Sequence, residues 1–101
     1  MHIRELQKDV YALAKSQGLW KNPPSLPESL AMIHAELSEA YEEYKNGYMP
    51  DHVYHFENKP EGIPIELADV VILIMSICEH HNIDLEGAMM EKHRYNRERE
   101  R

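Results

Sequence analysis

Two pairs of acidic residues have the types and the spacing to do chemistry. Glu36 and Glu39 form one pair, and Glu66 and Asp69 form the other. Side chains three positions apart lie on the same face of a helix, so each pair would present two carboxylates in one direction. Carboxylate oxygens suit Mg²⁺ and Mn²⁺, whereas zinc prefers nitrogen and sulfur ligands. The two pairs therefore predict a site for a hard divalent cation.

Both pairs lie next to the apolar side of a predicted helix. Glu36 and Glu39, with Glu43 one turn further on, border the stripe expected to face the core. Glu66 and Asp69 share their face with apolar residues of their own helix, namely Val70, Leu73 and Ile77. If the pairs meet, each like-charge contact at ~5 Å costs about 3 kcal/mol at an effective dielectric constant of ~20. Proton uptake or a bound cation must relieve this repulsion.

Simpler interpretations of these residues remain open. An acidic pair on a helix usually belongs to a solvated face, and acids in a first turn are favoured by the helix dipole. A zinc site is a further alternative, because His52 and His55 form an H-x-x-H motif, but they lie in a predicted loop without a nearby cysteine. We favour the hard cation because the acidic pair occurs twice, each time on an inward face.

Four helical segments must position these side chains, and strand signals are essentially missing. The predicted helices cover about Ile3–Gln17, Leu26–Asn46, Pro64–Asn82 and a last segment that follows Asp84 toward the C-terminus. The second begins after a capping box at Ser25. Residues 47–63 show no hydrophobic period, so we predict a loop there. We expect an all-α fold, a four-helix bundle, in a single domain that covers residues 1–101.

Apolar patterning predicts the buried faces. In the second segment a stripe at helical spacing is expected to face the core: Leu30, Ile33, Leu37, Ala40 and Tyr44. Residues 70–78 are apolar almost all round, which is typical of a helix in a bundle centre or an oligomer interface. A chain of this length buries only about 60–65% of its unfolded surface. Assembly into a homodimer or homotetramer is therefore expected.

The composition excludes several classes of partner. A net charge of −7 argues against nucleic acid and against anionic lipid, since both need a basic face. Cys78 is the only cysteine, which excludes a disulfide within the chain and suits a reducing cytosol. The longest apolar stretch is far short of the ~20 residues that a membrane span needs, and the N-terminus has no apolar signal region. We expect a soluble, cytoplasmic protein.

The last predicted helix adds hydrogen-bond donors to this acidic chain. One face of it begins apolar and ends with donors: Leu85, Met89, Lys92, Asn96 and Arg99. A metal site that also collects Lys, Asn and Arg fits a phosphorylated ligand, which a chain of charge −7 would otherwise repel. Taken alone, these cations are equally typical of a helix C-terminus.

Four short motifs, taken in their order and spacing along the chain, resemble those of the MazG-like superfamily of all-α nucleoside triphosphate pyrophosphohydrolases. This superfamily includes dimeric dUTPases and dCTP pyrophosphatases. The resemblance covers about residues 30–99. Its motifs are Glu36-Leu-Ser-Glu39, Glu66-Leu-Ala-Asp69, Ile83-Asp84-Leu85 and Lys92-x-x-x-Asn96. It implies Mg²⁺-dependent hydrolysis of a (deoxy)nucleoside triphosphate to the monophosphate and pyrophosphate, which clears or balances the nucleotide pool.

The resemblance also implies roles for individual residues. Metal binding would fall to Glu36, Glu39, Glu66 and Asp69, phosphate binding to Lys92 and Asn96 with Arg99 or Arg97, and the base side to Trp20. Glu36 or Glu39 would take the proton of the attacking water. The preferred base does not transfer, because Pro24 and Leu73 stand where the dCTP branch has a histidine and a tyrosine. The alternative function is a non-catalytic helical oligomerisation module with a structural divalent-cation site.

Overall fold

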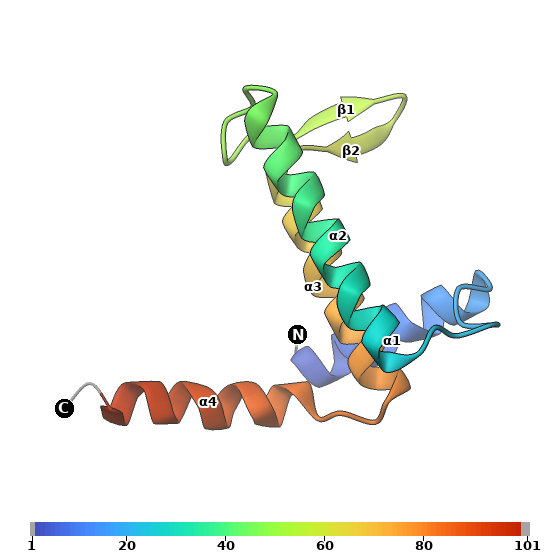
Figure 1. Cartoon of the computed structure of the whole chain (residues 1–101), viewed down its shortest axis with the longest axis vertical. Helices are drawn as coiled ribbons and strands as arrows, with labels where there is room; N and C mark the ends of the chain where they lie inside the picture. The colour runs from blue at the N-terminus through green and yellow to red at the C-terminus, as the bar shows by residue number, and fades with distance from the viewer. Residues whose placement is uncertain (1, 100–101) are drawn as a thin grey trace. The chain divides into compact units, whose positions relative to one another are not determined.

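Four helices and a two-stranded sheet make up residues 2–99, the part of the chain that this computed structural model describes (Figure 1). The helices are α1 (Ile3–Ser16), α2 (Leu26–Lys45), α3 (Ile63–His80) and α4 (Leu85–Arg99), and the strands are β1 (Tyr54–Phe56) and β2 (Lys59–Glu61). The predicted helices are confirmed, and their observed ends lie within two residues of the predicted ones. The fold is therefore mostly helical, as expected.

The ends of α2 follow from caps that the sequence encodes. The Ser25 hydroxyl accepts a hydrogen bond from the Glu28 backbone N–H at 3.3 Å, and the Glu28 carboxylate accepts one from the Ser25 backbone N–H at 2.9 Å. This pair is the predicted capping box. At the other end, Gly47 has a φ of 93°, and the Tyr48 N–H bonds back to the Glu43 carbonyl at 3.2 Å. The chain thus leaves the helix axis directly after α2.

The prediction of a loop over residues 47–63 is wrong for its second half, which forms an antiparallel hairpin of β1 and β2. Tyr54 pairs with Glu61 across the two strands. The turn residues Glu57 and Asn58 have positive φ values of 52° and 68°, as a type I′ turn requires. Glutamate is not a residue favoured there, and strands of three residues are too short to show an alternating pattern. For these two reasons the hairpin leaves little trace in the sequence.

Contacts divide the described chain into two compact units, and α3 contributes to both. The 22–74 unit holds α2, the hairpin and the first part of α3. The terminal unit holds the described residues up to 21 and from 75 onward, which comprise α1, the last part of α3 and α4. Both predicted acidic pairs fall in the 22–74 unit.

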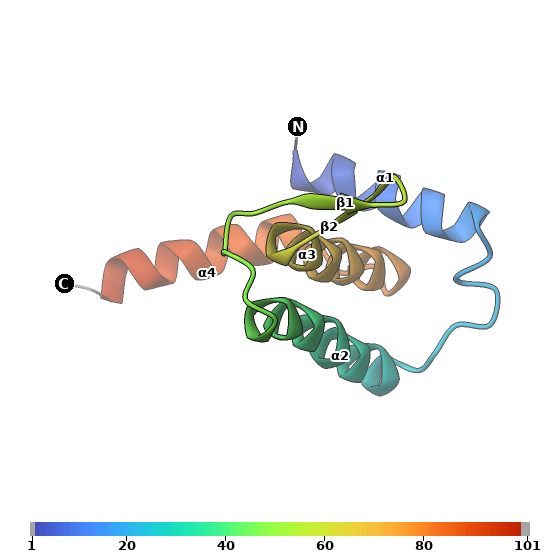
Figure 2. The ribbon, with the colours of Figure 1, turned by 90° about the horizontal axis from the view of Figure 1, so that it is seen from above.

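In the 22–74 unit, α2 and the first part of α3 run antiparallel; α2 lies in front of α3 in Figure 1 and next to it in the view from above in Figure 2. The buried residues of α2 are small: Ser29 is 1% exposed and Ala40 is 7% exposed. Glu36 and Glu43 are half-buried and share this face, because all four residues follow helical spacing. The inner face of α2 therefore carries small residues and carboxylates, together with the half-buried Ile33.

The predicted core stripe of α2 is wrong for its larger members. Leu30, Leu37 and Tyr44 are 50%, 49% and 63% exposed, whereas Ala40 is buried and Ile33 is half-buried. The physical reason is that the neighbouring face of α2, which carries the small residues Ser29 and Ala40, lies inward. The larger apolar side chains consequently lie on the outer surface of this helix.

Burial along α3 changes at the boundary between the units. Val71 and Ile72 are exposed in the single chain, where the sequence predicts a bundle centre or an oligomer interface, whereas every residue over 75–78 is buried. That buried stretch includes Ser76 and the free thiol of Cys78, whose pKa is raised by burial. Although α3 is very apolar, no helix in residues 2–99 meets the length and hydropathy that a membrane span requires.

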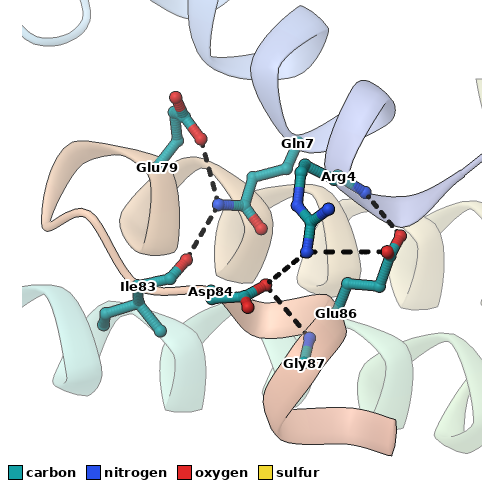
Figure 3. A network of polar contacts seen from close by, with 7 residues as sticks. All are labelled: Arg4, Gln7, Glu79, Ile83, Asp84, Glu86 and Gly87. Atoms are coloured by element: carbon teal, nitrogen blue, oxygen red, sulfur yellow. Dashed lines mark hydrogen bonds and ion pairs between the residues drawn. The ribbon is translucent and has the colours of Figure 1, made fainter.

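A polar network ties α1 to the end of α3 and the start of α4 in the terminal unit, as Figure 3 shows. The Arg4 guanidinium lies 3.2 Å from the Asp84 carboxylate and 3.7 Å from that of Glu86. Gln7 is buried, and its side-chain N–H groups donate to the Glu79 carboxylate and to the Ile83 carbonyl, both at 3.0 Å. These contacts fix the turn that connects α3 and α4.

Asp84 also caps α4, as predicted, because its carboxylate accepts a hydrogen bond from the Gly87 backbone N–H at 3.0 Å. Replacing Asp84 by Ala should lower the free energy of unfolding, since the helix loses its cap and Arg4 loses an ion-pair partner. Urea denaturation followed by circular dichroism measures this change. Asp9→Ala, which removes an exposed carboxylate from α1, is the control; an equal loss in both variants would contradict the capping role.

Candidate metal centre

Three of the four predicted metal-binding carboxylates come together in the 22–74 unit. Glu36 and Glu39 of α2 and Glu66 of α3 offer oxygens that all lie within 4.8 Å of one another. Octahedral Mg²⁺ holds its ligand oxygens at about 2.1 Å, which places neighbouring oxygens roughly 3 Å apart and opposite ones roughly 4 Å apart. The separations of up to 4.8 Å are close to this spacing, so small side-chain adjustments would suffice to hold such an ion.

Asp69, the fourth predicted ligand, is exposed and does not belong to that set of oxygens. Its charge nevertheless contributes to raising the pKa values of Glu36 and Glu66. Asp69 therefore lies at the edge of the acidic cluster, near enough to act on its electrostatics. The i, i+3 spacing placed Asp69 beside Glu66 along α3, but the expected inward position is wrong for Asp69, because its side chain is exposed.

Glu66 is the most enclosed member of the cluster. The residue is 8% exposed, and its Oε2 atom has no hydrogen-bond partner. Desolvation raises its pKa to about 7, and the hydrogen bond with Glu39 and the charges of Glu39, Asp69 and Glu61 act in the same direction. A buried carboxylate without a partner is costly unless a proton or a cation neutralises it. The unpartnered oxygen of Glu66 is therefore open to a proton or to a cation.

Glu36 shows the same effect to a lesser degree. Burial raises its pKa, and the negative charges of Glu39 and Asp69 raise it further. Two acids on different helices are thus held in their protonated form more readily than usual. The repulsion that the sequence predicts is present in the folded chain, because the neighbouring carboxylates raise the pKa values of both Glu36 and Glu66.

A second group of three carboxylates adjoins the first and shares Glu66 with it. Its other members are Glu43 of α2 and Glu61 of β2, with oxygens again within 4.8 Å of one another. The Tyr54 hydroxyl donates to both oxygens of Glu43, at 2.9 and 3.1 Å. The sequence indicated Glu43 as an extension of the first pair, but Glu61 and Tyr54 lie in the predicted loop and were missed.

Gly62 connects this second group to the start of α3. Its φ of 120° is in the region that glycine tolerates, and a Cβ there would collide with the carbonyl oxygen of His52. Its own carbonyl accepts the hydrogen bond of the Glu66 backbone N–H at 2.9 Å. The hairpin can therefore pass directly into α3, with Glu61 and Glu66 close in sequence and in space.

A pocket of about 400 Å³ opens beside the acids. Its lining is Glu39, Glu42, Glu43, Asn46, Tyr48, Tyr54 and Glu66. The Tyr48 and Tyr54 rings stack at 4.5 Å between centroids, with an interplanar angle of 13°, and form an aromatic wall. A ligand here would meet carboxylates on one side and aromatic rings on another, so a cation or a cation-bound group suits it best.

The residues predicted to contact phosphates lie on α4 in the terminal unit. Lys92 and Arg99 hold their cationic groups 4.8 and 5.9 Å from the centre of the Tyr95 ring. The side-chain oxygen of Asn96 is buried without a hydrogen-bond partner. The acids and these donors thus belong to different units, and their joint action on one ligand stays a prediction.

Trp20 also lies in the terminal unit. Its indole N–H donates to the Ser76 hydroxyl at 2.9 Å, and its ring stacks on His80 at 4.3 Å. His80 in turn shares a 2.8 Å hydrogen bond with the Tyr11 hydroxyl. These contacts give Trp20 a packing role in its own unit, and its predicted role beside a nucleobase is not tested by them.

Comparison of the chain with protein-family models, with curated proteins and with solved structures finds no match. The resemblance drawn from the motifs therefore stays a prediction. The acidic cluster and the order of the motifs in the chain are the two features that bear on its function.

Glu66→Gln should stabilise the metal-free protein by about 1–2 kcal/mol at neutral pH, because an amide removes a buried charge from repulsion. The folded pKa of Glu66, about 7, lies above its ordinary value of 4.5. Wild-type protein therefore loses stability as the pH rises between these two values, and the advantage of the variant should grow over this range. Urea unfolding in EDTA at a series of pH values measures it, with Glu91→Gln as the control; a pH-independent difference would contradict the assignment.

Proposed function

We propose that this protein is a Mg²⁺-dependent hydrolase that converts a (deoxy)nucleoside triphosphate to the monophosphate and pyrophosphate. The observation that carries the proposal is Glu66, a buried carboxylate with an unpartnered oxygen beside Glu36 and Glu39. The motif order that resembles the MazG-like superfamily supplies the reaction. The acidic cluster supports the cation on which that reaction depends.

The donors of the first group suit Mg²⁺ or Mn²⁺, since Glu36, Glu39 and Glu66 offer only carboxylate oxygens. A cation bound there would neutralise phosphate charge and lower the pKa of a water molecule. Every other part of the reaction falls to side chains of the chain. They must bind the triphosphate, hold the attacking water and accept its proton.

We assign the proton-accepting role to Glu36 or Glu39. The raised pKa of Glu36 makes its carboxylate a stronger base than an ordinary glutamate, while Glu39 is exposed and open to water. The carboxylate that makes fewer bonds to the cation is the better acceptor. The proton then leaves to solvent, as the exposed position of Glu39 allows.

The donors of α4 complete the proposed set. Lys92, Asn96 and Arg99 offer N–H groups that would stabilise the charge on departing pyrophosphate. A chain of net charge −7 needs such donors, because it otherwise repels a triphosphate. Trp20 is proposed to lie on the base side of the substrate. The role of Trp20 depends on the resemblance alone, whereas the three donors are also supported by their common helix face and by the charge of the chain.

We further propose a homodimer or homotetramer in which a second copy covers the outer face of α2. This face carries Leu30, Leu37, Tyr41 and Tyr44, which are spaced by seven, four and three positions and are all exposed. On α3, Leu67 is also exposed. Apolar stripes of this kind are typical of helices that pack against another helix.

The exposed stripe also favours the second candidate, a non-catalytic oligomerisation module whose cation is structural. Both candidates require the acidic cluster and the assembly. They differ in whether a nucleotide is hydrolysed, so one assay separates them.

Purified protein incubated with Mg²⁺ and a panel of common and modified nucleoside triphosphates should release pyrophosphate and monophosphate, and EDTA should stop the release. Glu39→Gln should lower kcat/KM about 10²–10⁴-fold with the fold intact, since a metal-binding or proton-accepting carboxylate is lost. Glu91→Gln, an exposed change on α4, is the control. Absence of product across the panel favours the oligomerisation module, and full activity of Glu39→Gln would contradict the catalytic assignment.

Replacing Leu37 by Lys should reduce the mass of the assembly, because a charge on the apolar stripe opposes contact with a second copy. Light scattering coupled to size exclusion measures the mass in solution. Ser38→Lys introduces the same charge at the neighbouring exposed position and should leave the assembly intact. A wild-type protein that is monomeric at all concentrations tested would overturn the proposal.

A further inference from the structure

A pocket in the terminal unit has no part in the function proposed above. Its volume is about 200 Å³, and its lining comes from α1, from the end of α3 and from the turn that leads to α4. Gln7 belongs to this lining and is only 5% exposed. Its side-chain oxygen Oε1 is buried without a hydrogen-bond partner. A buried amide oxygen of this kind destabilises the fold unless a donor reaches it.

The direction of the Gln7 amide is fixed by two acceptors. Its Nε2 atom donates to the Glu79 carboxylate and to the Ile83 carbonyl, both at 3.0 Å, which identifies the other terminal atom as the oxygen. Figure 3 shows this oxygen turned away from both acceptors, toward the space between Arg4 and Asp84. The Arg4 guanidinium is held by carboxylates instead, at 3.2 Å from Asp84. The Gln7 oxygen is therefore open to a donor from a bound molecule.

Two charged side chains of this pocket form no ion pair within the part of the chain that the structure describes. One is Glu79, which is half-buried and accepts a hydrogen bond from the neutral amide of Gln7. The other is Lys8, which is exposed on α1. By contrast, Arg4 and Asp84 in the same lining already neutralise each other. The pocket thus leaves one negative and one positive group to be matched by a ligand.

We infer that this pocket binds a small free α-amino acid. The ammonium group of such a ligand carries three N–H donors, which match the Gln7 oxygen and the Glu79 carboxylate. Its carboxylate matches the ammonium group of Lys8. A ligand with only one of these charges would leave the opposite charge of the pocket unmatched. The inference does not depend on the proposed hydrolase activity, because no residue of the acidic cluster takes part in it.

The test is a titration of the full chain with glycine, L-alanine and L-serine, which share the main amino-acid group and are small. Two-dimensional ¹H–¹⁵N NMR spectra should show saturable shifts of the side-chain amide of Gln7 with at least one of them. For the best binder, the N-acetyl form lacks the ammonium group and the amide form lacks the carboxylate. Each of these two forms should bind about ten-fold or more weakly, since each loses a charged hydrogen bond.

Glu79→Gln and Lys8→Met should each weaken binding by about ten-fold or more, for the same reason. Asp9→Asn is the matched control, because it removes an exposed charge of α1 outside the pocket and should leave binding unchanged. Circular dichroism and urea unfolding separate loss of a contact from loss of the fold, and Lys8→Met changes only an exposed side chain. No saturable shift with any of the three amino acids would overturn the inference, as would unchanged binding in Lys8→Met. Equal binding of the amide form would overturn it in favour of a simple amine.

Discussion

The burial of one carboxylate among others is the constraint on which the rest of this structure depends. Glu66 is 8% exposed, and it meets oxygens of Glu36, Glu39, Glu43 and Glu61 in two overlapping groups. A charge so placed destabilises the fold unless it is neutralised, which explains why the pKa of Glu66 rises to about 7. The folded chain therefore holds a proton on Glu66 more readily than on an ordinary glutamate, and the proposed cation would relieve the same repulsion.

The same constraint explains how α2 packs. To bring its carboxylates to Glu66, the helix turns its small residues Ser29 and Ala40 inward, and both are buried. Larger apolar residues such as Leu37 and Tyr44 then lie on the outer face, where their exposure to water is unfavourable. The acidic cluster and the apolar outer stripe are thus two results of one helix orientation, and this links the proposed cation site to the proposed assembly.

Local chemistry made much of the site predictable. The i, i+3 spacing placed Glu36 with Glu39, and these two meet Glu66 as expected. Asp69 was predicted to face inward but is exposed at the edge of the cluster, because the spacing along one helix does not determine the distance to the next helix. Glu61 and Tyr54 could not be foreseen, since their position depends on a hairpin whose turn contains Glu57 in a left-handed conformation. No periodic pattern records that conformation.

By itself the sequence determined the four helices and their ends, because periodicity, the Ser25 capping box and Asp84 act over a few neighbouring residues. It also determined that carboxylates would gather near an apolar face. Only the tertiary structure decided which face of α2 lies inward, which carboxylates share Glu66, and that the hairpin supplies Glu61. These outcomes depend on contacts between residues far apart in the chain, where the packing of whole elements sets the distances.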